Sequence, residues 1–234
     1  MSRIYVDKIN QVLKNKPLPE IIKFIYDEFD SKVALASSLG AEDQVLTDVI
    51  VKNAKELKIF TLDTGRLNPE TLDTLDKTEL KYSKRITVFY PKSELVEDFV
   101  NTHGINSFYE SVAKRKACCY ARKIEPLQRA LKPLDAWITG LRREQSVTRE
   151  EMQLAEWDEA NNLIKFNPLI DWSEQDVWDY IKKENVPYNK LHDLGYPSIG
   201  CAPCTRAIKD GEDIRAGRWW WENPEHKECG LHKR

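Results

Sequence analysis

Five cysteines in a chain of 234 residues have the clearest chemical potential. Cys118 and Cys119 are adjacent, and Cys201 and Cys204 form a Cys-x-x-Cys pair. Four thiolates are the set that a tetrahedral zinc site or an iron–sulfur cluster requires. Neighbouring helical side chains diverge by about 100°, so the adjacent pair suits a cluster of several irons better than one zinc ion. Taken separately, the Cys-x-x-Cys could be a redox dithiol or a coincidence, and the adjacent pair two buried small residues.

The fifth cysteine, Cys229, lies far from these pairs, in a stretch that also contains Gly230 and His232. A segment near the end of the chain is expected to be mobile, which would let the thiol move between a substrate and an external partner. His232 and nearby basic residues would favour the thiolate, the nucleophilic form. The alternative is a free surface thiol on a frayed tail.

Two further segments suit an anionic ligand. The stretch 37–43 (Ser-Ser-Leu-Gly-Ala-Glu-Asp) follows an apolar run, and its N–H groups and hydroxyls could form an oxyanion cradle. It lacks the Gly-Lys-Ser/Thr ending of a Walker loop, and a helix-capping turn without a ligand explains it equally well. Arg142 and Arg143 follow a later apolar run, and arginine forks suit phosphate or sulfate oxygens.

More cations lie near the cysteines in sequence. Arg215 and Arg218 precede three consecutive tryptophans, at 219–221, and Lys123 comes four residues after Cys119. Together with the serine stretch, these groups predict a ligand with more than one anionic centre. The alternatives are a solvated basic face with tryptophans filling a groove, and an exposed lysine on a basic helix.

Composition narrows the class of protein. The net charge is −2, from 36 basic and 38 acidic residues, which argues against a general nucleic-acid binder. A mean hydropathy of −0.59 without a long apolar run argues against a membrane span. The first ten residues lack the apolar core of a signal peptide, so we expect a cytoplasmic protein. An odd number of cysteines there favours ligand or catalytic roles over structural disulfides.

Apolar runs and helical periodicity alternate along most of the chain. Strands are predicted at 33–36, 59–62, 86–90, 136–140 and 163–169. Helices are predicted within 1–30, over 42–57, 93–102 and 111–132, and beginning at 68 and at 173; the helix over 111–132 is expected to bend near Pro126. This alternation implies βαβ units and a mostly parallel sheet. Ligands bind beyond the carboxyl ends of such strands, so the loops at 37–43, 63–66 and 140–145 are expected to converge.

The fold class expected is therefore α/β, one domain with a mostly parallel sheet flanked by helices, an irregular C-terminal lobe and a mobile tail. Its parts are predicted as an N-terminal helical segment (1–30), an α/β nucleotide-binding core (31–185) and a lobe and tail (186–234), which hold three of the five cysteines.

These stretches resemble the assimilatory adenylyl-sulfate (APS) and phosphoadenylyl-sulfate (PAPS) reductases. The matching segments run in the family's order and spacing from about residue 33 to the end: 37–43, Leu-Asp-Thr-Gly-Arg at 62–66, Cys-Cys at 118–119 with Arg-Lys at 122–123, Gly-Leu-Arg-Arg-Glu-Gln-Ser at 140–146, Cys-Ala-Pro-Cys at 201–204, Arg-Ala-Gly-Arg-Trp-Trp at 215–220 and Glu-Cys-Gly-Leu-His at 228–232.

The resemblance implies an adenine nucleotide α-hydrolase-like fold and a 4Fe–4S cluster held by Cys118, Cys119, Cys201 and Cys204. Members with this cysteine pattern mostly use APS, whereas members without it use PAPS. The resemblance makes Cys229 the nucleophile: it attacks the sulfuryl sulfur, releases AMP and becomes a Cys-S-sulfonate. Thioredoxin or a glutaredoxin-like dithiol then releases sulfite, which feeds sulfate assimilation and cysteine biosynthesis. Leu39 stands where the related pyrophosphatases commonly have a smaller residue, which argues against ATP cleavage.

The same resemblance assigns the substrate contacts. They are expected from Ser37, Ser38, Gly40, Leu62, Asp63, Gly65, Lys123, Gly140, Arg143, Arg215, Arg218 and His232. Among the alternatives are a PAPS-preferring or dual APS/PAPS reductase and, in a different class, a metal- or redox-sensing binding protein that would have no use for Cys229. No nucleic-acid or membrane partner is expected, and a homo-oligomer is one of the assemblies that the sequence allows.

Overall fold

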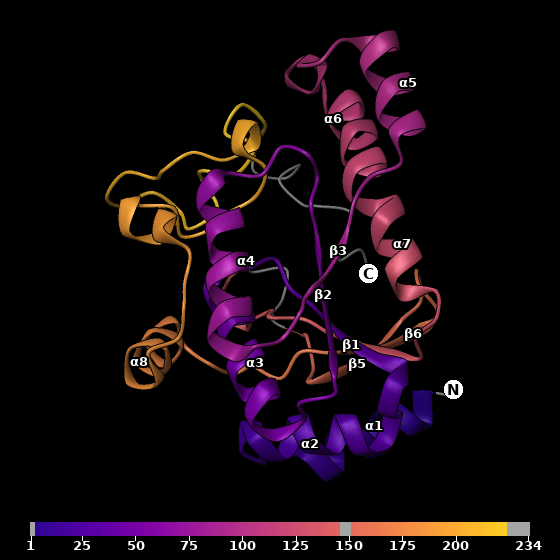
Figure 1. The fold of residues 1–234 in the computed structure, drawn as a ribbon, viewed down its shortest axis with the longest axis vertical. Helices are drawn as coiled ribbons and strands as arrows, with labels where there is room; N and C mark the ends of the chain where they lie inside the picture. Colours follow the sequence, from indigo (N-terminus) through magenta and orange to yellow (C-terminus); the bar gives the residue numbers. More distant parts are fainter. Residues whose placement is uncertain (1–2, 146–150, 224–234) are drawn as a thin grey trace. The chain divides into compact units, whose positions relative to one another are not determined.

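A computed structural model describes residues 3–145 and 151–223. The α-helices are α1 (Arg3–Leu13), α2 (Leu18–Phe29), α3 (Ala41–Asn53), α4 (Pro69–Tyr82), α5 (Ser93–His103), α6 (Val112–Cys119), α7 (Glu125–Leu131) and α8 (Glu174–Glu184). The strands are β1 (Val33–Ala36), β2 (Lys58–Leu62), β3 (Thr87–Phe89), β4 (Ala136–Ile138), β5 (Ala155–Asp158) and β6 (Leu163–Phe166). Figure 1 traces these elements along the chain.

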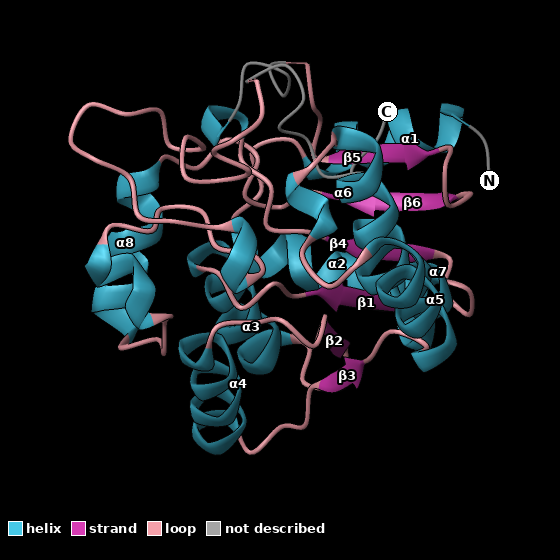
Figure 2. Cartoon of the chain, turned by 90° about the horizontal axis from the view of Figure 1, so that it is seen from above, coloured by secondary structure: helices cyan, strands magenta, loops and turns pink. Residues whose placement is uncertain are grey.

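The strands form one six-stranded sheet in the order β3-β2-β1-β4-β6-β5 (Figure 2). The pairs β1–β2, β1–β4 and β4–β6 are parallel, and β5 pairs antiparallel with β6 at one edge. Consecutive residues, at 33–35 of β1 and 136–138 of β4, are each at most 3% exposed, as expected for parallel strands covered on both faces. The prediction of a mostly parallel sheet flanked by helices is confirmed.

Helix α8 begins where the sequence predicted. The Ser173 hydroxyl accepts the Asp176 N–H, and the Asp176 carboxylate accepts the Ser173 N–H in return, which makes a capping box. Val177 and Ile181 then bury one face of the helix. At its other end Asn185 adopts the left-handed conformation that often ends a helix.

The predicted long helix over 111–132 is interrupted earlier than expected. Between α6 and α7, residues Tyr120–Ile124 form a π-helical turn (η3), and Pro126 lies in the first turn of α7. Proline has no N–H and its ring crowds the carbonyl four residues earlier, so a widened turn just before it relieves the clash. Such turns are frequent at functional sites, and this one directly follows Cys118 and Cys119.

The chain divides into two compact units built from discontinuous stretches. Unit 1 comprises residues 1–61, 74–87 and 131–188, and unit 2 comprises residues 62–73, 88–130 and 189–234. The main hydrophobic core, with side chains from α1, α2, α3 and α8 and from the strands, belongs to unit 1. The segment boundaries expected after residues 30 and 185 stay a prediction. Among the described residues, no helix is long and apolar enough to cross a membrane.

Candidate active site

In unit 1, the loop after β1 is held by its own polar groups. The Ser37 hydroxyl accepts the Leu39 N–H at 3.1 Å. Leu39 is fully buried and has a φ of 63°, a conformation that few residues other than glycine adopt. Burial of the leucine side chain thus stabilises a tight turn that leads into α3. At the helix start, Gly40 offers no side chain to cap the first N–H groups, and such groups attract anions.

Asp43, in the first turn of α3, holds this loop through its carboxylate. Its Oδ2 accepts both the N–H and the hydroxyl of Ser38, each at 2.6 Å. Burial raises the pKa of the Asp43 carboxyl to about 6, against the opposing effect of the Ser38 hydrogen bonds. The Gly140 N–H also bonds to this carboxylate, and a Cβ on Gly140 would come within 2.3 Å of Asp43 Oδ1. The loops after β1 and β4 therefore meet as predicted, and Gly140 allows their close approach.

The two adjacent arginines of the loop after β4 differ in environment. Arg142 is buried, and its Nε donates to Glu42 Oε1 at 2.9 Å. Arg143 instead pairs with the exposed Asp171 at 2.8 Å and donates to the Met152 carbonyl at 2.7 Å. Arg142 thus ties the loop to the start of α3, while Arg143 is exposed enough to exchange its partner for a ligand. Its role in substrate binding stays a prediction.

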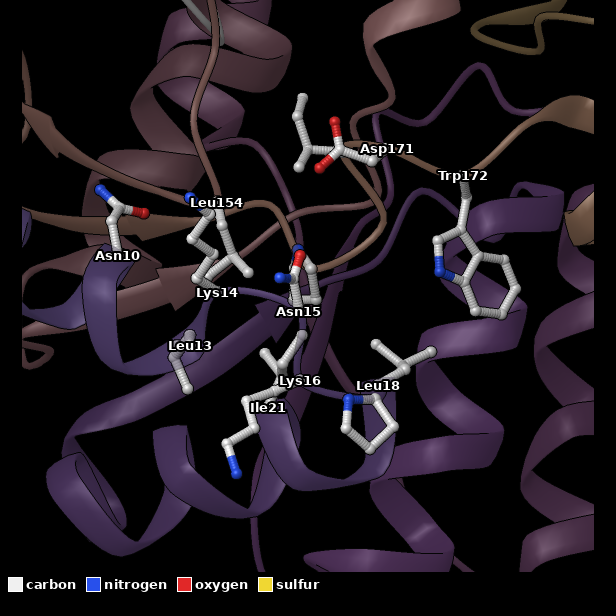
Figure 3. A pocket seen from close by; sticks show the side chains of 13 residues that line it. Asn10, Leu13, Lys14, Asn15, Lys16, Leu18, Ile21, Leu154, Asp171 and Trp172 are labelled. Atoms are coloured by element: carbon white, nitrogen blue, oxygen red, sulfur yellow. The ribbon is translucent and has the colours of Figure 1, made fainter.

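Unit 1 also contains a pocket of about 570 Å³, lined by the turn between α1 and α2 and by the segment that follows β6 (Figure 3). Several of its polar groups already have partners. Asn10 bonds to Gln153 and to the Ala155 carbonyl, and Lys16 pairs with Glu20. No sequence-predicted site residue that the structure describes lines this pocket, so we do not assign it to the predicted chemistry.

Unit 2 brings the two cysteine pairs together. Cys118 and Cys119 end α6; Cys201 directly precedes the short 3₁₀ turn at 202–204, and Cys204 is the last residue of that turn. Cys118 and Cys204 share one apolar cluster with Phe99, Phe108 and Trp221. All four described cysteines are free thiols. Segments separated by about eighty residues therefore meet at one apolar surface.

Electrostatic coupling shows that three of these thiols are neighbours. Burial, and then the charges of Cys201 and Cys118, raise the pKa of the Cys204 thiol to about 12. Burial and the nearby Cys201 likewise raise the pKa of Cys118, although Arg122 opposes this. Burial would also raise the pKa of Cys201, but Lys123, a hydrogen bond from Thr64, Arg218 and Arg122 together lower it. Burial thus favours the neutral thiol at Cys118 and Cys204, whereas the surrounding cations favour the thiolate at Cys201.

The four cysteines supply the type of donor that a metal cluster needs. Among the described residues, no set of three His, Cys, Asp or Glu side chains is arranged to hold a metal ion. Soft, free thiols among cations are the ligands that an iron–sulfur cluster uses, so the residues fit that group.

The loop at 63–66 frames the cysteines. The Thr64 hydroxyl is hydrogen bonded to Cys201 Sγ at 3.2 Å, and the Arg66 carbonyl accepts the Ala202 N–H at 2.8 Å. Arg122 donates from Nη1 to the Thr64 carbonyl at 2.7 Å. Sequence reasoning assigned no role to Thr64, Arg66 or Arg122. The only signal for them was their position inside the segments that carry the resemblance.

Two predicted substrate residues of this loop have a local structural role. The Asp63 carboxylate accepts the Gly65 N–H at 2.8 Å, a bond that closes a tight turn. Gly65 has a φ of 69°, so glycine suits the position. Leu62 ends β2 and is half-buried. Their contacts with a substrate stay predictions, as does the convergence of this loop with those of unit 1.

The predicted cations of unit 2 are divided between the turn after α6 and the C-terminal lobe. Lys123 lies in η3 and acts on both Cys201 and Cys204. Arg218 is buried and donates to Ser198 Oγ at 3.3 Å; Arg215 is half-buried three residues earlier, and its carbonyl accepts the Arg218 N–H at 2.9 Å. Cys229 and His232, the predicted nucleophile and its neighbour, lie outside the described residues.

Comparison with known proteins identifies the family. Residues 32–207 match the family described as phosphoadenosine phosphosulfate reductase domain. A relative named adenosine 5'-phosphosulfate reductase, from Allochromatium vinosum, is 57% identical over 215 residues, which cover 92% of this chain and 84% of the relative. The chain belongs to this reductase family. A relative of the same name from Agrobacterium fabrum is 50% identical over 201 residues, 86% of this chain and 77% of the relative.

Solved structures agree with this family and its fold. A crystal structure of phosphoadenylyl-sulfate (PAPS) reductase from Candida auris, in a phosphate complex, superposes with a TM-score of 0.76 at 30% identity and covers 89% of this chain and 98% of that one. FMN adenylyltransferase of Candida glabrata, bound to FAD and pyrophosphate, gives a TM-score of 0.54 at 15% identity over 95% of this chain and 75% of that one. The second likeness shows the fold alone. The adenine nucleotide α-hydrolase-like fold expected for the reductase family is confirmed.

Proposed function

We propose that this protein reduces adenosine 5'-phosphosulfate to sulfite and AMP in assimilatory sulfate reduction. The observation that carries the proposal is the cysteine set of unit 2, buried among Arg122, Lys123 and Arg218, in a chain that is 57% identical to a relative named for this reaction. The proposed chemistry needs free thiols, which a reducing cytoplasm maintains.

The nucleophile in this proposal is the Cys229 thiolate. A bond forms between its sulfur and the sulfur of the substrate's sulfuryl group, while the bond from that sulfur to the bridging oxygen breaks. AMP leaves with the bonding electron pair, and Cys229 carries a sulfonate. A thiolate of thioredoxin or a glutaredoxin-like protein then attacks the Cys229 sulfur and expels sulfite. The partner's second thiol completes its own disulfide and releases Cys229, so the dithiol supplies both electrons.

Charge neutralisation is the main task of the surrounding residues. The oxygens of the sulfuryl group repel an approaching thiolate, and Lys123, Arg143, Arg215, Arg218 and His232 would offset that charge as the S–O bond breaks. For the nucleotide we assign Leu62 and Gly140 to the adenosine and Ser37 and Ser38 to the ribose and phosphate, with Gly40, Asp63 and Gly65 shaping the loops around them.

A 4Fe–4S cluster is the cofactor that we assign to Cys118, Cys119, Cys201 and Cys204. When bound, it would supply a fixed local field rather than the electrons of turnover. In this proposal the cluster and its cysteines position Lys123, because the lysine ammonium is attracted to the thiolates of Cys201 and Cys204. The lysine then presents its charge to the sulfuryl oxygens.

Replacement of Cys229 by serine tests the activity. Anaerobically purified wild-type protein should contain four irons per chain and release sulfite from APS when a dithiol protein is added. The Cys229→Ser variant should keep its iron and lose sulfite release. Undiminished sulfite release would contradict the proposal, and a chain that binds iron but produces no sulfite in either form would be a metal- or redox-sensing protein. A parallel assay with PAPS separates an APS enzyme from a PAPS-preferring or dual one.

A further inference from the structure

Unit 2 contains a buried ion pair that the proposed chemistry does not use. Arg115, on α6, donates to Glu222 through two nitrogens, from Nε at 2.9 Å and from Nη2 at 2.7 Å. The Arg115 and Glu222 side chains are 1% and 3% exposed. A bidentate pair of this kind fixes the plane of the guanidinium as well as its position. Glu222 therefore fixes the orientation of the Arg115 guanidinium.

The oriented guanidinium lies against Trp219. Arg115 Cζ is 4.6 Å from the Trp219 ring centroid, and Arg218 Cζ is 4.7 Å from the same ring. We call this arrangement the Arg115–Trp219–Arg218 stack. The indole nitrogen of Trp219 is buried and has no hydrogen-bond partner within the described part of the chain. The cation–π contacts, rather than a hydrogen bond from the indole, orient the ring.

Trp219 needs such support because its backbone is strained. Its φ is 40°, in the left-handed region that a bulky residue rarely enters. Residues in such conformations persist where surrounding contacts hold them, and they cluster at ligand sites. The Trp219 N–H donates to the Cys204 carbonyl at 3.2 Å. The strained residue thus links the Cys-x-x-Cys turn to the stack.

The stack also connects the first cysteine pair to a predicted substrate residue. At one end, the Arg115 guanidinium interacts with the Cys119 thiol, one helical turn further along α6. At the other end, Arg218 is assigned to the sulfuryl group under the proposed function. Gly200 permits its position, because a Cβ there would come within 2.6 Å of Arg218 Nη2.

We propose that Arg115 is a positioning residue: held by Glu222, it orients Trp219 and through it the guanidinium of Arg218 toward the sulfuryl end of the substrate. This inference rests on the proposed function. A purely structural ion pair would affect the binding of both nucleotides equally, whereas a positioning role affects the binding of the sulfuryl group in particular. The sulfuryl group is present in APS and absent from AMP, so the affinity ratio of the two nucleotides reports on the stack.

Equilibrium binding of APS and AMP to the Cys229→Ser protein gives this ratio without turnover. Two further substitutions are made in that background. Arg115→Lys keeps the positive charge but loses the planar, bidentate guanidinium, and Glu222→Gln removes the carboxylate that holds it. Each should reduce the preference for APS over AMP about tenfold, the size expected when one charged hydrogen bond is lost. Iron content should not change. The control is Glu212→Gln, which breaks the half-buried Arg206–Glu212 pair of the same lobe and should leave the ratio unchanged.

The outcomes separate the two proposals. If the Cys229→Ser parent itself binds APS no better than AMP, the proposed function fails. If the parent prefers APS and either Arg115→Lys or Glu222→Gln retains the full preference, the positioning role is wrong. Should the single variants not fold, the Arg115→Met, Glu222→Leu double variant replaces the buried pair with apolar side chains, a change that proteins often tolerate. It should lose the preference, and retention would overturn the inference.

Discussion

The Thr64 hydroxyl is hydrogen bonded to the Cys201 sulfur at 3.2 Å, although the two residues are 137 positions apart in the chain. Both are buried, and the Arg122 guanidinium donates to the Thr64 carbonyl at 2.7 Å. A hydroxyl that donates to a thiolate stabilises its charge. Thr64 is therefore a supporting residue of the cysteine site rather than a spacer in the loop at 63–66.

Replacement of Thr64 by valine keeps the shape of the side chain and removes the hydroxyl. Loss of such a supporting contact typically lowers metal affinity about 10- to 100-fold. We expect the Thr64→Val protein, purified with iron, to lose it to a chelator correspondingly faster. The control is Thr102→Val on the exposed surface of α5. Equal rates of iron loss in all three proteins would show that Thr64 does not support the site.

Lys123 should affect chemistry without affecting the cofactor. A cation that offsets charge in the transition state is worth about 10²- to 10³-fold in rate. The Lys123→Ala protein should therefore form the Cys229 sulfonate about a hundredfold more slowly, in a single turnover followed by mass spectrometry. Lys116→Ala, at an exposed position of α6, serves as the control. If the Lys123→Ala protein forms the Cys229 sulfonate at the normal rate, Lys123 does not neutralise the sulfuryl charge.

Asp43 makes stability depend on pH in one direction. Its folded pKa of about 6 lies above the ordinary value of 3.8, so between these pH values the folded chain keeps a proton that the unfolded chain has lost. The stability from this group is present below about pH 4 and lost as the pH rises through 6. Two pKa units correspond to roughly 3 kcal/mol.

The variant Asp43→Asn removes this titration. In urea unfolding, the free energy of unfolding of wild type minus that of Asp43→Asn should fall by roughly 3 kcal/mol between pH 4 and pH 7. The exposed Asp210→Asn should show a difference that stays flat. A flat difference for Asp43→Asn as well would mean that the loop does not hold a proton on this carboxyl.

The adjacent residues Arg142 and Arg143 should differ in their contribution to stability. Arg142→Met leaves the Glu42 carboxylate without its guanidinium partner in a largely buried position and should cost about 3 kcal/mol of unfolding free energy. Arg143→Met breaks a pair with Asp171, whose side chain is 77% exposed, and should cost less than about 1 kcal/mol. The two variants serve as controls for each other in urea unfolding. Equal costs would contradict the burial difference.

Most of the sheet could be predicted because its strands are buried on both faces. Continuous apolar runs such as Val33–Ala36 and Ala136–Ile138 carry that signal in a few residues. Strand β5 was missed: its sequence Ala-Glu-Trp-Asp is short and polar at every second position, and its pairing with β6 sets its structure. A bend was predicted near Pro126, and the irregular turn lies just before it, at 120–124, because the chain relieves the proline's clash in the preceding turn.

The site was predictable where residue type alone indicates chemistry. Four cysteines in two pairs predict thiolate ligands wherever the chain places them. The supporting contacts were not predictable, because they join distant segments: Glu42 and Arg142 are 100 residues apart, and Arg115 and Glu222 are 107 apart. The resemblance assigned a substrate contact to Arg143 alone, but the sequence could not show that Arg142 is buried against Glu42, because identical neighbours acquire different partners only in the folded chain.

The central claim is that Cys229 takes the sulfuryl group from adenosine 5'-phosphosulfate. The most direct test incubates the anaerobically purified protein with APS and without any dithiol, then measures the intact mass, the modified peptide and the AMP released. We predict a mass increase of one sulfonate group per chain, located on Cys229, with one AMP released per chain and no adduct on Cys229→Ser. An unmodified chain, or a sulfonate on any other cysteine, would contradict the account.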